Sequence, residues 1–463
     1  MKTVIFFSYL SLCLVSLGCK TEKQPQEDLG KPNIIFLLTD DQRWDALGIM
    51  GNNIIQTPNL DRLAGEGVLF KNAYVTTSIC AVSRASFFSG QYMSRHGIED
   101  FQTSFSEEAF EQTYPMILKK AGYNIGFVGK FGVGNPKEQP AGKFDFWAGS
   151  DKGQPDYEMT DGDGNYIHHT DKVGKDVERF LEDWGDKGPF NLSVSFKAPH
   201  VQDNDPRQFI INPRYKDYYK EDSIPVPLTA DPKYWESFPD FFRTDDNIGK
   251  ERWYLRFKTP KMYQESVKNY YRLITDVDDM VGRMMDQLEA QGLADNTVII
   301  FMGDNGFYLG EHGLAGKWYG HEESIRVPLF IYDPRTEGNR KGSVSEEIVL
   351  NIDVAPTILR LAGQNIPESM QGQDLITLIN GGGTSRGDFF YEHTFMGSPK
   401  IPKIEGVVSL EEKYMIFTEH GYEQYFDLKK DPKETVNLAE DISYGEKVNV
   451  LRERYQLLKW QVR

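Results

Sequence analysis

Residues 32–41 read PNIIFLLTDD, a continuous apolar run that ends in two adjacent carboxylates, Asp40 and Asp41. An apolar run without alternation predicts a strand buried on both faces, as in a parallel sheet covered by helices. Two neighbouring carboxylates at the end of such a strand repel each other unless a cation lies between them. The stretch therefore predicts an α/β fold, and it indicates a cation site at the carboxyl end of the first strand.

Three further buried strands are predicted, each followed by polar or charged side chains. They are residues 124–129 (NIGFVG) before Lys130, residues 190–196 (FNLSVSF) before Lys197 and His200, and residues 298–302 (VIIFM) before Asp304 and Asn305. Helical patterns separate the strands, which predicts a mostly parallel central sheet sandwiched by helices. Sites in open α/β sheets lie outside the carboxyl ends of the strands, so we expect these side chains to converge at one edge.

The composition of the chain excludes two classes of protein. Of its 463 residues, 39% are hydrophobic and 13% are aromatic, which indicates a globular rather than a disordered protein. The net charge of −17 argues against nucleic acid as a partner, because binding to phosphates requires a basic face.

The first residues of the chain carry the features of an export signal. Lys2 precedes an apolar run that is too short to cross a membrane, which is typical of a signal peptide over residues 1–18. The run stops at Cys19 in a pattern that resembles a bacterial lipoprotein signal, so we predict lipidation of Cys19 and a polar tether over residues 19–31. We expect a periplasmic or outer-membrane protein that contacts the membrane through this anchor only. The alternatives are ordinary signal cleavage and retention of the segment as an anchor.

Residues 78–90 (SICAVSRASFFSG) place Cys80 at the start of a short helix, with Arg84 one turn further on. The N-terminus of a helix lowers the pKa of a thiol and attracts anions. Cys80 is the only cysteine after residue 19, so it forms no disulfide within the folded body. A free thiol in an exported protein is a liability unless it is buried or used in chemistry.

Two regions outside the predicted sheet have their own character. Residues 201–260 are rich in Asp, Pro, Tyr and Phe without a regular period, which predicts an irregular insertion over the site, followed by an amphipathic helix over residues 267–288. The composition changes near residue 381. Strand-like runs and a final helical pattern predict a small α+β subdomain, residues 381–463, packed on a catalytic domain of residues 32–380.

The polar residues at the strand ends indicate a type of chemistry. Oxygen donors without a Cys or His cluster favour Ca²⁺ or Mg²⁺ over Zn²⁺; these donors are Asp40, Asp41, Asp304 and Asn305. Lys130 and Lys317 can neutralise a bound anion, and His200 can act as a general acid toward a leaving oxygen. An anion held by a divalent cation and lysines beside a nucleophile indicates sulfuryl or phosphoryl transfer.

The order and spacing of short motifs show a family resemblance that extends from residue 32 to the C-terminus. The chain resembles a formylglycine-dependent sulfatase of the alkaline phosphatase superfamily. The matching motifs are residues 38–41 (LTDD), 80–84 (CAVSR), 89–90 (SG), 129–130 (GK), 199–200 (PH), 303–306 (GDNG), 311–313 (EHG), 316–317 (GK), 322–328 (EESIRVP) and 426–432 (FDLKKDP). The resemblance implies an alkaline phosphatase-like fold.

The resemblance also implies roles for the candidate residues. A formylglycine-generating or sulfatase-maturing enzyme would oxidise Cys80 to formylglycine, whose hydrated aldehyde supplies the nucleophilic oxygen. Arg84 would stabilise that hydrate, and Lys130 and Lys317 would hold the sulfate oxygens. His200 would protonate the leaving oxygen. The implied Ca²⁺ ligands are Asp40, Asp41, the modified Cys80, Asp304 and Asn305.

Two positions depart from the family pattern. Val82 stands where the maturation motif has Pro or Ala, and residues 129–134 read GKFGVG where the family has GKWHLG. The histidine that assists the formylglycine hydroxyl is thus replaced by Gly132. Either another group takes over its role, with His312 and His321 as candidates, or this branch of the family dispenses with it.

The sequence therefore predicts a sulfatase that acts on a sulfated saccharide. His312, His321 and His393 are candidate substrate-binding residues, and the aromatic insertion with residues 391–393 suits a sugar-binding rim. Aryl sulfates and choline sulfate are alternative substrates. Two other functions stay open: a phosphodiesterase or phosphonate hydrolase of the same superfamily, and a lipoprotein that binds sulfated glycan without cleaving it.

Overall fold

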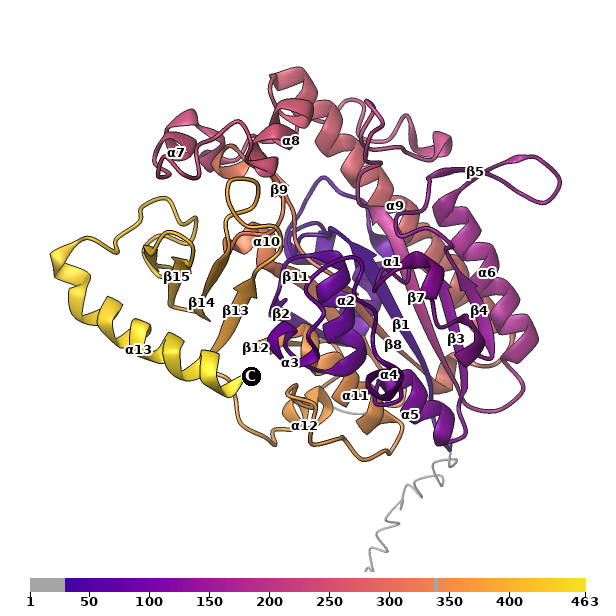
Figure 1. Ribbon diagram of the computed structural model, residues 1–463. Helices are drawn as coiled ribbons and strands as arrows, with labels where there is room; N and C mark the ends of the chain where they lie inside the picture. The colour runs from indigo at the N-terminus through magenta and orange to yellow at the C-terminus, as the bar shows by residue number, and fades with distance from the viewer. Residues whose placement is uncertain (1–29, 337–339) are drawn as a thin grey trace, which may run out of the picture. The chain divides into compact units, whose positions relative to one another are not determined.

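An eight-stranded sheet forms the centre of the protein in the computed structural model, which describes residues 30–336 and 340–463 (Figure 1). Only β11 runs against its neighbours β8 and β2, so the sheet is mostly parallel, as the sequence predicts. In spatial order the strands are β12 (Ser343–Leu350), β2 (Val68–Tyr74), β11 (Arg326–Tyr332), β8 (Thr297–Gly303), β1 (Asn33–Asp40), β7 (Phe190–Pro199), β3 (Asn124–Gly129) and β4 (Phe146–Gly149).

Helices cover both faces of the sheet because the side chains of each strand alternate between two cores. Ile35 and Leu37 of β1 pack in one core with α1 (Pro58–Glu66), α6 (His169–Trp184) and α9 (Pro260–Ala290). Ile34 and Phe36 point the other way, toward α2 (Cys80–Ser89), α5 (Tyr114–Lys120) and α11 (Val354–Leu361). All eight residues of β1 are buried, which explains its unbroken apolar sequence.

The insertion before α9 is less irregular than its sequence suggests. It contains α7 (Pro232–Glu236) and α8 (Ile248–Arg256), which lie at the top of Figure 1. The signal for α8 is a single side chain: Asn247 accepts hydrogen bonds from the amides of Gly249 and Lys250 and so caps the helix. The expectation of a wholly irregular segment is wrong for this helix.

A second sheet of four antiparallel strands lies in the C-terminal part of the chain, with α13 (Gly445–Gln461) packed on it. Its strands are β13 (Asp388–His393), β14 (Ile404–Ser409), β15 (Glu412–Phe417) and β16 (Tyr422–Asp427). The two sheets share apolar contacts; the rings of Tyr74 in β2 and Phe389 in β13 have centroids 5.1 Å apart. Residues 31–463 form one compact unit.

Short elements complete the chain between these layers. They are α3 (Met93–His96), α4 (Glu107–Phe110), α10 (Glu322–Ile325), α12 (Leu375–Ile379), β5 (Glu158–Thr160), β6 (Tyr166–His168), β9 (Tyr308–Leu309) and β10 (Ala315–Gly316). No helix within the described residues has the length and apolarity needed to cross a membrane. The predicted signal peptide, most of the tether and Cys19 lie outside the described residues.

Candidate active site

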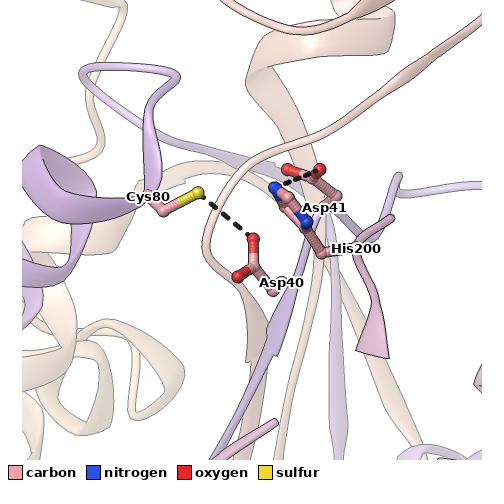
Figure 2. A group of neighbouring side chains, drawn as sticks. All are labelled: Asp40, Asp41, Cys80 and His200. Atoms are coloured by element: carbon pink, nitrogen blue, oxygen red, sulfur yellow. Dashed lines mark hydrogen bonds and ion pairs between the residues drawn. The ribbon is translucent and has the colours of Figure 1, made fainter. Parts of the chain in front are cut away.

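Polar side chains from four strand ends meet at the first turn of α2. They come from the carboxyl ends of β1, β3, β7 and β8, from the segment after β10 and from α2 itself. All are buried: Asp40, Asp41, Cys80, Arg84, Lys130, His200, Asp304, Asn305 and Lys317. Figure 2 shows Asp40, Asp41, Cys80 and His200 pointing toward one another. The convergence expected from the strand ends is present for these side chains but not for Lys197, whose ammonium donates to the carbonyl of Pro155 and to Gln202. Helix α2 contributes Cys80 and Arg84.

Oxygen atoms suited to a hard cation are concentrated in this cluster. One ligand atom from each of Asp40, Asp41, Cys80 and His200 lies within 4.8 Å of the others. The side-chain oxygen of Asn305 is buried and has no hydrogen-bond partner among the described residues, while its amide nitrogen donates to Asp41 at 2.6 Å. An unpaired buried oxygen beside carboxylates fits a divalent cation such as Ca²⁺.

The pKa values of Asp40 and Asp304 are shifted in opposite directions. Burial and the nearby negative charge of Asp40 raise the pKa of Asp304 to about 7. Burial acts in the same direction on Asp40, but the positive charges of Lys130 and His200 hold its pKa well below the usual value. Asp304 would therefore gain from a bound cation, because a positive charge offsets its repulsion from Asp40.

Three side-chain cations surround the acids and the thiol. The guanidinium of Arg84 donates to Asp304 at 2.9 Å and to the carbonyl of Lys130 at 2.7 Å. The Lys130 ammonium donates to Asp40, and the Lys317 ammonium donates to Asp41. These donors converge on one small volume and are fixed by buried partners, which suits an anion with several oxygens.

Cys80 is the first residue of α2, but its environment does not activate the thiol. The Sγ atom donates to Oδ1 of Asp40 at 3.2 Å and lies 2.9 Å from Nζ of Lys317. Burial and the charge of Asp40 raise the pKa of the thiol to about 12. The prediction that the helix N-terminus lowers this pKa is wrong, because desolvation and the carboxylate outweigh the helix dipole and the two lysines.

His200 presents one ring nitrogen to the cluster. Its Nδ1 lies 2.7 Å from the carbonyl of Val201, which fixes Nδ1 as the donor. Its Nε2 lies 3.5 Å from Asp41 and 3.2 Å from the side-chain nitrogen of Gln154. Burial lowers the pKa of His200 although Asp41 and Asp40 raise it. Nε2 is therefore the atom that can exchange a proton with a bound group.

Comparison with known proteins identifies the family. Residues 32–364 match the family described as "Sulfatase". The chain belongs to the sulfatase family. The enzyme is therefore a sulfuric ester hydrolase. Residues 310–461 also match the family described as "N-sulphoglucosamine sulphohydrolase, C-terminal".

The sulfatase is similar over almost its whole length to curated and solved relatives. It is 32% identical to the arylsulfatase of Clostridium perfringens, over 91% of this chain and 93% of the relative. It is 28% identical to the N-acetylglucosamine-6-O-sulfatase of Bacteroides thetaiotaomicron, over 98% and 90%. Among solved structures, a protein in complex with its substrate D-glucosamine-2-N,6-O-disulfate superposes with a TM-score of 0.77 at 26% identity, covering 94% of this chain and 98% of that one.

Gly132, which stands where the family has a histidine, lies close to two cations of the site. Its φ is +73°, and a Cβ placed on it would lie 2.9 Å from Cδ of Arg84 and 3.3 Å from Cε of Lys130. The side chain of Arg84 thus fills the space next to Gly132. The sequence shows that Gly132 departs from the family pattern, and the structure shows that Arg84 lies next to it.

The three other candidate histidines lie apart from this cluster. The rings of His312 and His321 stack with centroids 4.3 Å apart, and Phe238 packs against both. Burial holds the pKa of His312 at about 3, so it stays neutral. His393 in β13 is fully buried, and its role in substrate binding stays a prediction. Within the described chain, none of the three hydrogen-bonds to the nine clustered residues.

Two residues that hold the site were missed in the sequence. Ser195 in β7 accepts a hydrogen bond from Arg84, and Gln154 contacts His200. Ser195 lies two residues before Lys197 at the end of a buried strand, so its position was a usable signal. Gln154 lies between β4 and β5, where no pattern marks it.

Proposed function

We propose that this sulfatase hydrolyses sulfate esters of carbohydrates through a formylglycine made from Cys80, with Ca²⁺ bound beside it. The position of Cys80 is the observation that carries the proposal: its Sγ lies 3.2 Å from Oδ1 of Asp40 and 2.9 Å from Nζ of Lys317, at the centre of the buried cluster. With a pKa of about 12, the thiol is not a nucleophile at neutral pH. A maturing enzyme that supplies the oxidant would replace the sulfur by an aldehyde oxygen, and the hydrated aldehyde gives this position an oxygen nucleophile.

The oxygen donors would bind the metal ion, and the cationic side chains would bind the substrate. The residues that would hold Ca²⁺ are Asp40, Asp41, Asp304 and Asn305. The cation supplies Lewis-acid stabilisation of the sulfate oxygens and of the modified side chain. Lys130 and Lys317 then orient the sulfate through charge-assisted hydrogen bonds. Arg84 is fixed by Asp304 and would stabilise the aldehyde hydrate at position 80, one helical turn away.

His200 would supply the proton for the leaving oxygen. Its Nε2 atom faces the cluster, while Nδ1 is held by the carbonyl of Val201. Burial lowers the pKa of the imidazole and so favours its neutral form, whereas the carboxylate of Asp41 favours the protonated form. A group with this balance can give a proton to an alkoxide leaving group and recover it from water.

Carbohydrate as the substrate class rests on the relatives and on the insertion. Printed names among the relatives include N-acetylglucosamine-6-O-sulfatase, and one solved relative binds a disulfated glucosamine. Trp235 of the insertion lies next to Gly313, just before β10, and α8, which carries Trp253, packs on β10. A phosphonate monoester hydrolase of Agrobacterium radiobacter superposes with a TM-score of 0.78, but at 22% identity it shows only the shared fold.

Release of inorganic sulfate tests the proposed function. The matured protein is incubated with N-acetylglucosamine 6-sulfate, p-nitrophenyl sulfate and a phosphonate monoester in the presence of Ca²⁺. We expect sulfate from the sugar at a kcat/KM well above that for the phosphonate. Faster hydrolysis of the phosphonate supports the phosphonate hydrolase alternative. Binding of the sugar without any release of sulfate supports the non-catalytic alternative.

We further propose that the sulfatase is exported and lipid-anchored. The pattern that ends at Cys19 supports lipidation, and the polar residues 20–31 suit a tether. The test is metabolic labelling with a radioactive fatty acid in the native host. Incorporation that a Cys19→Ala variant abolishes is the expected result, and a labelled variant or an unlabelled wild type contradicts it.

A further inference from the structure

Helix α8 carries an excess of positive charge in an acidic protein. The net charge of the chain is −17, yet α8 contains the cations Lys250, Arg252 and Arg256. Between residues 30 and 463, apart from residues 337–339, these three have a single carboxylate within 4 Å, that of Asp203. Three cations that have one carboxylate between them need an explanation, because a protein of this charge offers many acidic partners.

The position of α8 connects these cations to the active site. The helix packs on β10, the strand that directly precedes Lys317. The guanidinium of Arg252 lies 5.1 Å from the ring centroid of Trp318, the residue after Lys317. The hydroxyl of Tyr391 donates to the carbonyl of Trp318 at 2.6 Å and so holds this residue in place. Arg252 therefore contacts Trp318, and the residue before Trp318 is Lys317, whose ammonium contacts Cys80.

Asp203 connects Arg252 to the other side of the site. It follows His200 by three residues, and its Oδ1 lies 3.6 Å from the guanidinium of Arg252. Although burial raises it, the positive charges of His200 and Arg252 hold the pKa of Asp203 below its usual value. Arg252 thus lies between the segment that carries the predicted acid and the segment that carries Lys317.

The ion pair between Arg252 and Asp203 is weak enough to be exchanged. At 3.6 Å it is long for a charge-assisted hydrogen bond, and the two side chains are 25% and 38% exposed. Arg256, one turn along α8, is buried; one terminal nitrogen has no hydrogen-bond partner in the described part of the chain, and its Nε donates to Gln208. The charges of Arg252 and Arg256 both act on Asp203.

We propose that Arg252 binds a second anionic group, a sulfate or a carboxylate, on the saccharide whose target sulfate lies at Cys80. The planar guanidinium matches two oxygens of such a group. Trp318 supports the guanidinium from one side, which orients its free edge. The inference rests on the proposed carbohydrate substrate, and it makes this enzyme a sulfatase for saccharides that carry more than one negative charge.

Direct binding separates this inference from the proposed function. Calorimetry uses the full chain with Cys80→Ala, which cannot turn over, and three probes: glucosamine 6-sulfate, glucosamine 2-N,6-O-disulfate and a 6-sulfated disaccharide that contains a uronate. The second probe supplies a second sulfate and the third a carboxylate. Arg252→Met is compared with Arg252→Lys, which keeps the charge, and with Arg243→Met. Arg243 is a matched control because it belongs to the same insertion and pairs with Asp240.

We expect Arg252→Met to weaken binding of at least one doubly charged probe by about 10- to 100-fold, the range of one charge-assisted contact, and binding of the monosulfate by much less. Arg252→Lys should recover part of the loss, and Arg243→Met should leave the affinity for all three probes unchanged. Equal losses for all three probes, or no loss for any, would overturn the inference. Failure of the proposed function would appear elsewhere, as absent sulfate release from sugars by protein with an intact Cys80.

Discussion

Replacing Gly132 with alanine tests how tightly the catalytic cations are packed. Two effects add in this variant. A residue other than glycine at a φ of +73° costs about 1 kcal/mol of stability. In addition, the new Cβ would lie 2.9 Å from Cδ of Arg84, so the arginine must move. Arg84 is fully buried and donates to Asp304 at 2.9 Å, so any movement weakens a hydrogen bond between charged groups.

A hydrogen bond of this kind contributes about 1.5 to 3 kcal/mol, which corresponds to about 10- to 100-fold in kcat/KM if the contact is lost in the transition state. The matched control is Gly97→Ala, since Gly97 has a φ of +71° and no atom within 4 Å of an added Cβ.

The assay is hydrolysis of p-nitrophenyl sulfate by the matured proteins, with urea unfolding measured in parallel. We expect Gly97→Ala to lose about 1 kcal/mol of stability and no activity. Gly132→Ala should lose at least as much stability and about 10- to 100-fold in kcat/KM. Wild-type activity in Gly132→Ala, with the same stability as the control, would refute the argument that Arg84 fills this space.

Three further predictions follow from buried charges. His200→Gln should lower kcat/KM by about 10²- to 10⁴-fold for a sugar sulfate but far less for p-nitrophenyl sulfate, whose leaving group needs no proton; equal losses would contradict the acid role. Removal of Ca²⁺ by chelation should lower the melting temperature, with recovery on adding Ca²⁺ at 100 times its Kd worth about 2.7 kcal/mol, and Asp304→Ala should abolish this response. Burial raises the pKa of Asp278 to about 6, so its carboxyl ionises later in the folded than in the unfolded protein. Stability should therefore fall by about 2 kcal/mol as the pH rises from 4 to 6, and Asp278→Asn, compared by urea unfolding, should remove that part of the slope.

The central sheet and the location of the site could be predicted because each rests on local sequence. The four central strands are buried on both faces, so their apolar runs are unbroken and their ends are sharp. The carboxyl ends of parallel strands share one edge, and this rule places Asp40, Lys130, His200 and Asp304 together without knowledge of any contact.

The features that sequence could not show depend on packing between distant segments. The thiol of Cys80 has a raised pKa because burial and Asp40 dominate over the helix terminus. Gln154 reaches His200 from a loop without a regular pattern. His393 lies inside the second sheet, since alternation in β13 does not say which neighbour covers each face. Each of these outcomes requires the tertiary structure.

The mass of the tryptic peptide of residues 72–84, from protein made in the native host, tests the central claim most directly. This peptide contains both Cys80 and Val82, so it reports whether the unusual maturation motif is accepted. We predict that an aldehyde oxygen has replaced the sulfur at residue 80. A peptide that carries only the unmodified thiol, in protein that nevertheless releases sulfate from sugars, would contradict the proposed mechanism.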